Sequence, residues 1–305
     1  MIYNMARLDP RTFLKRKRVL SKLITLGIIS EKELIVNGQP VIFHDLKSSN
    51  LLKQIAVHGF DSYETELVTL LRTWPFPLST FFDCGANIGF FSVLTALYRP
   101  EVTVVAVEPF PLNVSYIQKL TEKNALQVEL VDTALSSEQS ESVTLYYPTG
   151  NRSSQLSSSA SLKNSFKGSG SLFDHIPFRS VEVRSTTLDS LTKSRRLPIL
   201  VKLDCEFLEY QILLGGASLL ANNDVDVIVE IGLADEDKKQ VYDLMLDNGF
   251  SSYLITHAGL VRENRPLTFP FPSRTNRTIW RNHLFTKKSV SEIRDLSLTS
   301  YGHWI

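Results

Sequence analysis

Short apolar runs alternate with stretches of helical periodicity between Thr80 and Phe285, and turn-forming residues separate them. Apolar runs of strand length occur at 80–82, 102–107, 128–131, 199–203, 225–231, 252–256 and 279–285. Helical spacing of apolar residues occurs at 88–98, 112–123, 208–220 and 236–248. Strands that alternate with helices are typical of a parallel α/β sheet, and the pattern predicts that architecture here.

The alternation is interrupted after the third predicted strand. Two further strand-like runs, at 143–147 and 181–184, flank a polar segment, and nine of the 21 residues from Asn151 to Ser171 are serine. Such a composition buries too little apolar surface to order the segment by itself. Residues 151–175 are therefore predicted to form either a lid over a site or an inert loop.

The region before Thr80 is predicted to be an N-terminal helical cap whose last helix lies at 63–72. Residues 1–30 hold seven Lys and Arg side chains and a single acid, Asp9, with Leu and Ile at near-helical spacing. A basic amphipathic helix can lie on an anionic membrane surface, on an acidic partner, or on its own domain with a solvated basic face. The predicted organisation is a cap at 1–62, an α/β domain at 63–290 and a tail at 291–305.

Composition narrows the class of protein. The chain has 305 residues, 43% of them hydrophobic, and a formal net charge of +1, which disfavours a nucleic-acid-binding protein that relies on bulk charge. Two cysteines, Cys84 and Cys205, are too few for a disulfide framework, and their spacing is not that of metal ligands. This low cysteine content favours a protein of a reducing compartment. No apolar run reaches the roughly 18 residues of a membrane span. We expect a cytoplasmic protein, or one peripheral to a membrane through residues 1–30.

The strongest local motif is Asp-Cys-Gly-Ala-Asn-Ile-Gly at 83–89, where a predicted strand gives way to a helix. Gly85 allows a sharp turn and a close approach of the backbone to a ligand. Glu108 follows Gly89 by 19 residues, at the end of the next strand, where a carboxylate can accept both hydroxyl hydrogens of a ribose. The pair predicts a site for an adenosine-containing cofactor. The alternative is that the two glycines serve strand–helix packing alone and Glu108 is a solvated carboxylate.

The same motif favours S-adenosylmethionine over a dinucleotide. A nicotinamide cofactor calls for Gly-x-Gly-x-x-Gly, with the pyrophosphate on the helix N-terminus. Here Asn87 stands where the second glycine would be, and Asp83 would repel a pyrophosphate. A carboxylate at that position can instead hold the ammonium group of a methionine moiety, directly or through water.

A second acidic cluster follows the strand predicted at 199–203. It contains Asp204, Glu206 and Glu209, and the two glutamates suit the first turn of a helix. Asp204 ends a buried strand, where an unpaired carboxylate is costly, so we expect it to belong to the site. Glu230, at the end of the next strand, is a similar candidate.

Taken in order, these motifs resemble the FkbM-type methyltransferases. The resemblance runs from about Tyr63 to Phe285 and is carried by 83–92, 108–111, Asn124, 134–136, 186–191, 201–209, 215–217 and Glu230. It implies a Rossmann-like class I methyltransferase fold, with a mostly parallel seven-stranded sheet whose last strand is antiparallel. It also implies S-adenosylmethionine-dependent O-methylation of a sugar, glycan or natural-product hydroxyl.

On this interpretation, each of the loops that follow the first three strands binds a different part of the cofactor. Asp83, Gly85 and Asn87 are expected to hold its methionine end, Glu108 its ribose, and the backbone around Asp132 its adenine. The predicted cofactor contacts are Asp83, Gly85, Ala86, Asn87, Gly89, Glu108, Pro109, Asp132, Thr133, Ala134 and Asp204.

An aliphatic hydroxyl needs a base as its bond to the methyl group forms. Asp204 is the first candidate, and Glu230 and His58 come next. His58 can equally be a packing residue. Asp204 and Glu206 form an alternative pair of ligands for a divalent metal that would acidify the hydroxyl.

One position departs from the family pattern. The family has glycine where this chain has Phe207, and a bulky ring there is expected to narrow the acceptor pocket or displace a backbone contact. Phe207 keeps open the alternative of a non-catalytic protein that binds an adenosine cofactor. An NAD-dependent oxidoreductase is a further alternative, although the pyrophosphate turn is missing.

Overall fold

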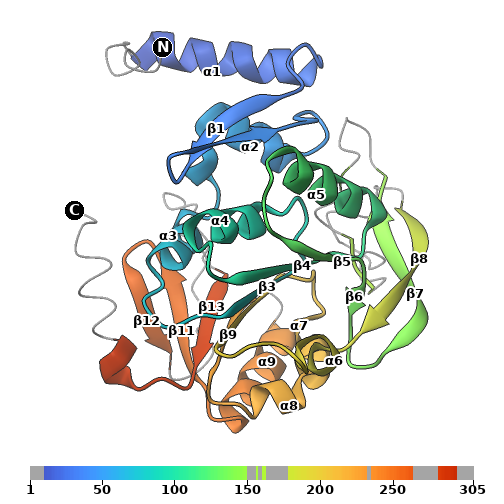
Figure 1. The fold of residues 1–305 in the computed structure, drawn as a ribbon, viewed down its shortest axis with the longest axis vertical. Coiled ribbons are helices and arrows are strands. Elements are labelled where there is room, and N and C mark those ends of the chain that lie inside the picture. The colour runs from blue at the N-terminus through green and yellow to red at the C-terminus, as the bar shows by residue number, and fades with distance from the viewer. Residues whose placement is uncertain are drawn as a thin grey trace.

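The computed structural model describes residues 10–149, 156, 160–162, 178–231, 235–263 and 281–293, apart from the side chains of 10–13 and 235–238. Most of the predicted serine-rich lid or loop at 151–175 and most of the predicted tail at 291–305 lie outside these residues. Figure 1 shows a layered α/β body, with helix α1 (Pro10–Thr25) lying across one end of it.

Eight strands form the large sheet. Their bounds are β3 Thr80–Cys84, β4 Thr103–Val107, β5 Glu129–Val131, β9 Ile199–Leu203, β10 Val225–Glu230, β11 Ser251–Thr256, β12 Gly259–Glu263 and β13 Asn282–Thr286. Their order is β12–β11–β13–β10–β9–β3–β4–β5, and the five from β10 to β5 are parallel. Strand β13 pairs antiparallel with both β10 and β11. The predicted mostly parallel sheet with an antiparallel last strand is confirmed, and β12 adds an eighth strand to the predicted seven.

Helices cover both faces of this sheet (Figure 1). One layer holds α3 Thr65–Thr73, α4 Phe90–Tyr98 and α5 Pro111–Lys123; the other holds α6 Leu188–Thr192, α7 Glu209–Leu214, α8 Ala217–Leu220 and α9 Asp235–Asp247. Side chains alternate between the layers because the strand period is two. Phe81 therefore joins the core beside α4, while Phe82 joins the core beside α7.

The helix predicted at 208–220 is broken into α7 and α8 at Gly215 and Gly216. A β-carbon on Gly215 would lie 2.5 Å from the carbonyl oxygen of Ser136, so the backbone there passes too close to its neighbour for any other residue. The two adjacent glycines are a local signal for this break, although glycine inside a helical pattern is often tolerated.

The two strands predicted around the polar segment form a separate small sheet. β7 (Ser140–Pro148) pairs antiparallel with β8 (Phe178–Thr186), and β8 also pairs with the short β6 (Ala134–Leu135). This sheet stands at the β5 edge of the body, on the right of Figure 1. It carries the chain from the end of β5 to α6 and places β7 beside the site described below.

The N-terminal cap is only partly helical. It contains α1, α2 (Asn50–His58) and the 3₁₀ turn η2 (Phe60–Ser62), but also the hairpin β1 (Lys32–Val36) and β2 (Gln39–Phe43), which was not predicted. Asn37 and Gly38 form the hairpin turn with positive φ angles of 48° and 73°. An Asn-Gly pair favours this turn because both positions require φ above zero. Within the described residues, the helices are all too short or too polar to cross a membrane.

Candidate active site

The carboxyl ends of β3, β4 and β9 meet at one edge of the sheet. The register aligns Cys84 with Val107 on one side and with Leu203 on the other, so the loops that follow these strands converge. The order of strands along the chain reverses at β3, between β9 and β4. Ligands bind in open α/β sheets at such a reversal, where neighbouring loops part to opposite faces.

The loop from β3 to α4 packs directly against the backbone that follows β9, at Gly85 and Asp204. Gly85 has φ +78°, and a β-carbon at this position would lie 1.9 Å from the carbonyl oxygen of Asp204. Asn87 also has a positive φ, 55°. Only glycine fits at 85, because any side chain would overlap the neighbouring backbone.

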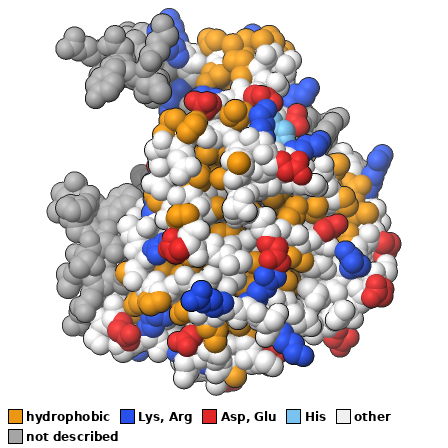
Figure 2. Space-filling view, in the orientation of Figure 1, with side chains coloured by type: hydrophobic (Ala, Val, Ile, Leu, Met, Phe, Trp, Pro, Cys, Tyr) orange, Lys and Arg blue, Asp and Glu red, His pale blue; other side chains and the backbone are white. Residues whose placement is uncertain are grey.

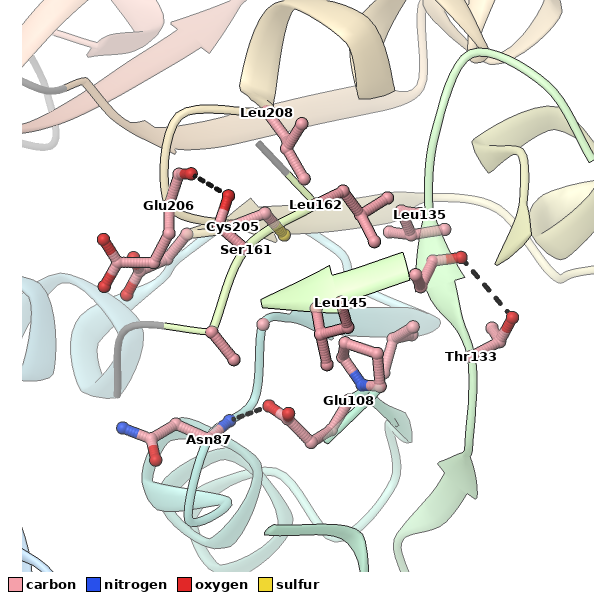
Figure 3. A pocket seen from close by; sticks show the side chains of 16 residues that line it. Asn87, Glu108, Thr133, Leu135, Leu145, Ser161, Leu162, Cys205, Glu206 and Leu208 are labelled. Carbon is pink, nitrogen blue, oxygen red and sulfur yellow. Dashed lines mark hydrogen bonds between the residues drawn. The ribbon is translucent and has the colours of Figure 1, made fainter. Parts of the chain in front are cut away.

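Glu108 follows β4 and ties this loop in place. One carboxylate oxygen accepts the backbone N–H of Asn87 at 2.7 Å, and the other accepts the N–H of Phe110 at 2.9 Å (Figure 3). Burial raises the pKa of Glu108 to about 7, although both N–H groups act to lower it. The side chain of Asn113 in α5 donates to the same carboxylate. Of its four acceptor positions, an ionised Glu108 therefore keeps one for a ligand hydroxyl.

A narrow cavity lies above this loop (Figure 3). Its polar side is formed by the 85–87 turn, Glu108 and Asp204, and Leu135, Leu145 and Leu208 supply an apolar side. The enclosed space is about 50 Å³. A carboxylate that can accept a ribose hydroxyl, beside an apolar slot, suits the ribose and adenine of an adenosine cofactor.

Residues 160–162 form the outer wall of this cavity. Ser161 is fully buried, exchanges backbone hydrogen bonds with Tyr146 of β7, and donates its hydroxyl to the carbonyl oxygen of Glu206 at 2.8 Å (Figure 3). Ligand pockets enclose roughly 300–1,000 Å³. The space enclosed in this structure is therefore smaller than an adenosine group occupies.

A second, open pocket of about 480 Å³ adjoins the first. The two share Gly85, Asn87, Asp204 and Glu206. The second pocket is further lined by Tyr63, Glu64, Glu66, Glu230, Arg281 and Asn282. We call the first the adenosine cavity and the second the acceptor pocket. Asp204 stands at their junction.

Lys202 is a buried cation behind this junction. Its ammonium group lies 3.1 Å from a carboxylate oxygen of Asp204 and 4.8 Å from the centre of the Phe91 ring. Burial by itself would lower the pKa of Lys202, but the carboxylates of Asp204, Asp83, Glu64 and Glu230 raise it, so the ammonium form is favoured. The sheet thus supplies a fixed positive charge beneath a group of acids.

The acids of the acceptor pocket raise one another's proton affinity. Glu64, Asp204 and Glu230 each place a carboxylate oxygen within 4.8 Å of the others. Burial and the Asp204 carboxylate raise the pKa of Glu230, and they raise that of Glu206 to about 8. Arg281 lies 3.5 Å from Glu230, and Asn282 donates to Glu64 at 3.1 Å.

The sequence-predicted residues fall into two groups. The structure brings seven of the predicted cofactor contacts to the adenosine cavity: Gly85, Asn87, Glu108, Pro109, Thr133, Ala134 and Asp204. The other four, Asp83, Ala86, Gly89 and Asp132, line neither pocket. Asp83 is buried and accepts the hydroxyl of Ser92 in α4 at 2.7 Å. Its carboxylate therefore supports the loop from behind, and Asp132 is exposed beside a separate groove.

The candidate bases are also divided. Asp204 and Glu230 both line the acceptor pocket, whereas His58 lies at the end of α2, where the Lys17 ammonium approaches its Nδ1 at 3.2 Å. Burial and Lys17 lower the pKa of His58. For a metal, the structure gathers Glu64 with Asp204 and Glu230, in place of the predicted pair Asp204 and Glu206.

Sequence reasoning missed three groups in this site. Lys202 had a usable signal, because a lysine inside an otherwise apolar strand, two residues before Asp204, must share a face with it. The sequence gives no such signal for Glu64 or Arg281. Glu64 precedes the first strand of the sheet, and Arg281 follows a long polar segment. Only the folded chain places both beside Glu230.

Phe207 takes up an unusual backbone conformation. It has φ +74°, next to Glu206 with φ 52°, which is the left-handed region that glycine adopts without strain. Its side chain is 36% exposed and lines neither pocket. The predicted narrowing of the acceptor pocket is therefore not found. The helix start is held instead by Glu209, whose carboxylate accepts the N–H of Cys205 at 2.9 Å.

The doubly wound sheet with its antiparallel β13, and the glycine turn facing an acid at the end of the next strand, define a class I methyltransferase dependent on S-adenosylmethionine. The chain belongs to the FkbM methyltransferase family: the model of the methyltransferase FkbM domain matches residues 83–252. Among curated proteins, no sequence matches the chain.

Several solved structures are similar to the chain. Methyltransferase FkbM from Methylobacillus flagellatus has 13% sequence identity and a TM-score of 0.41; the match covers 88% of this chain and 58% of that one. A SAM-dependent methyltransferase from Agrobacterium tumefaciens has 8% identity and a TM-score of 0.41, with coverage of 85% and 71%. The N-terminal domain of human METTL16 has 10% identity and a TM-score of 0.44, with coverage of 95% and 98%.

Proposed function

We propose that this methyltransferase transfers the methyl group to a hydroxyl of a sugar, a glycan or a natural-product small molecule. The observation that carries the proposal is the position of Asp204, in the wall of both the adenosine cavity and the acceptor pocket. A carboxylate at this junction stands where a hydroxyl must lose its proton as the new C–O bond forms. S-adenosylmethionine, when bound, supplies the electrophilic methyl group.

The side chains of the acceptor pocket support a polyhydroxyl acceptor. Five of the described side chains that line it are carboxylic acids and one is an arginine, Arg281. Glu206 and Glu230, with pKa values raised to about 8 and about 9, are protonated at neutral pH and offer hydrogen-bond donors as well as acceptors. The pocket is therefore suited to neutral sugars, whose hydroxyl groups both donate and accept hydrogen bonds.

The residues divide the work of orientation and proton removal. Lys202 holds the Asp204 carboxylate in position from below, so Asp204 can receive the hydroxyl hydrogen without turning away. Glu230, whose pKa is raised to about 9, keeps its proton at neutral pH and donates a hydrogen bond to Asp204, so it orients the carboxylate that accepts the hydroxyl hydrogen. The remaining rate acceleration comes from alignment of the acceptor hydroxyl with the methyl group of the cofactor.

The cofactor half of the proposal is tested first, by calorimetric titration with S-adenosylhomocysteine. Micromolar binding is expected for the wild type, with a large loss in Glu108→Ala, which removes the acceptor of a ribose hydroxyl. The control is Glu138→Gln, which changes an exposed acid outside both pockets. If the folded wild type does not bind, the proposed contacts of this cavity are contradicted.

The transfer half is tested with labelled S-adenosylmethionine and a panel of neutral, amino and acidic sugars. Methylated product from neutral or amino sugars is expected, and Asp204→Asn is expected to lower its rate by about 100-fold or more. A chain that binds S-adenosylhomocysteine tightly but methylates no hydroxyl would favour a non-catalytic binding protein. Product that forms on nitrogen alone would contradict O-methylation.

A further inference from the structure

A basic groove runs between α1 and α2, away from the two pockets of the active site. It encloses about 830 Å³, and its lining includes Lys17, Arg18 and Lys22 from α1 together with Lys53 and His58 from α2. The described residues that line the groove include no Asp or Glu. This concentration of positive charge contrasts with a formal net charge of only +1 for the whole chain.

One base of the groove has a lowered proton affinity. Burial, together with the Lys17 ammonium, lowers the pKa of His58, and Lys17 lies at hydrogen-bond distance from Nδ1 of that ring, 3.2 Å away. The cations that line the groove therefore stand beside a histidine that favours its neutral form. Their combined positive charge attracts an anion.

The face of α1 beside the groove exposes apolar side chains. Val19 is 58% exposed and Leu26, just after the helix, is 62% exposed, while Ile24 is the buried anchor of α1. At 100° per residue, Val19 and Leu26 lie next to Lys15 and Lys22 on the wheel. Figure 2 shows apolar side chains gathered at this end of the molecule, with basic ones beside them.

We propose that the α1–α2 groove and the adjoining face of α1 form a docking surface for an anionic phospholipid membrane. Lipid headgroup phosphates bind in the groove between Arg18, Lys22 and Lys53, and Val19 and Leu26 enter the boundary between headgroups and acyl chains. Both halves of the surface are needed for this assignment. A nucleic acid would satisfy the cations and leave the aliphatic side chains in water, whereas an anionic bilayer satisfies both.

The test is sedimentation of the full chain with vesicles of phosphatidylcholine, either pure or with about 30 mol% phosphatidylserine. Binding is expected only with phosphatidylserine and should weaken as salt is added. Arg18→Glu with Lys22→Glu is expected to weaken binding by more than about 25-fold, since each lost charge accounts for about fivefold. Val19→Ser with Leu26→Ser should also weaken it.

The matched control is Lys193→Glu with Arg196→Glu. These exposed residues follow α6, at the end of the molecule opposite α1 in Figure 1, and the change should leave vesicle binding unaltered. All variants are first shown to be folded by titration with S-adenosylhomocysteine, whose cavity does not include α1.

Four results of the vesicle experiment would each overturn the proposal. These are equal binding of folded wild type to both kinds of vesicle, no binding to either, equal loss in the control variant, and unchanged binding in the serine variant. Soluble glycerophosphoserine and a single-stranded RNA are titrated in parallel. If either binds as tightly as the vesicles, the groove is a site for a free anion or a nucleic acid, and the membrane assignment is wrong.

Discussion

The ammonium group of Lys202 lies 3.1 Å from the Asp204 carboxylate, with Lys202 only 2% exposed. Lys202→Met leaves the Asp204 carboxylate, whose side chain is 24% exposed, without its cation, and water screens part of the remaining charge. The substitution is therefore expected to lower the free energy of unfolding by roughly 1–3 kcal/mol, measured by urea denaturation. Lys193→Met, which changes an exposed lysine, is the control and should alter it by less than about 0.5 kcal/mol.

A second variant separates the ion pair from simple packing. In the double variant Lys202→Met, Asp204→Asn, much of the loss should be recovered, because the unpaired charge is removed as well. Losses that add without coupling would show that the two side chains do not stabilise each other.

The close approach of Gly85 to Asp204 makes a clear prediction about cofactor binding. Gly85→Ala is expected to abolish binding of S-adenosylhomocysteine, because its β-carbon would overlap the Asp204 carbonyl oxygen. Gly249→Ala is the matched control: it has a similar φ, +82°, but nothing within 4 Å of an added β-carbon. It should lose only the roughly 1–2 kcal/mol of the left-handed backbone and keep its affinity. Equal affinity in both variants would contradict this role of the turn.

The pKa of Glu108, raised to about 7 by burial, predicts a pH dependence of cofactor affinity. A carboxyl group with a raised pKa keeps its proton below that pH, and the ionised form is the better acceptor for a ribose hydroxyl. The affinity for S-adenosylhomocysteine should therefore rise severalfold from about pH 6 to about pH 8. In Glu108→Gln it should be weaker and nearly flat. A wild-type profile that matches the variant's would exclude Glu108 as the titrating group.

Phe207 predicts an unusual response to substitution by glycine. Its φ of +74° costs a non-glycine residue roughly 1–2 kcal/mol, and its ring lines neither pocket. Phe207→Gly is expected to leave the free energy of unfolding unchanged or to raise it by up to about 1 kcal/mol. Phe207→Ala keeps the strain and loses the ring, so it should be the less stable of the two. The reverse order would show that ring packing outweighs the strain.

Metal removal gives a further prediction. Methyl transfer is expected to persist in EDTA, because the Lys202 ammonium already supplies positive charge beside Asp204. The measurement is the rate with EDTA and with added MgCl₂, for an acceptor found in the panel. If activity is lost in EDTA and restored by Mg²⁺, the carboxylates of Glu64, Asp204 and Glu230 are the ligands. Glu64→Gln would then raise the Mg²⁺ concentration needed.

Local pattern was sufficient for most of the α/β body. Strand β9 has the predicted bounds, and β3 and β4 differ from prediction by two residues or fewer, since each is a continuous apolar run between turn residues. The hairpin β1–β2 was missed although its Asn37-Gly38 turn is a local signal, because the cap was interpreted as helical throughout. Strand β12 was missed for a different reason: Gly259–Glu263 contains only two apolar side chains, Leu260 and Val261, and is an edge strand that pairs with β11.

By itself, the sequence determined the alternating architecture, the turn at Gly85, and the acids at the ends of the strands. These depend on side-chain period, on glycine's freedom at positive φ, and on the convergence of parallel strand ends. The tertiary structure alone decided which of those acids face a pocket. It turned Asp83 towards Ser92, placed His58 beside Lys17, and brought Glu64 to Glu230 across the fold. Lys17 and His58 are 41 positions apart, and Glu64 and Glu230 are further apart still, so no local pattern encodes these contacts. Asp83 and Ser92 are only nine positions apart, but the packing of α4 on β3 decides that this carboxylate turns to the helix and away from the pockets.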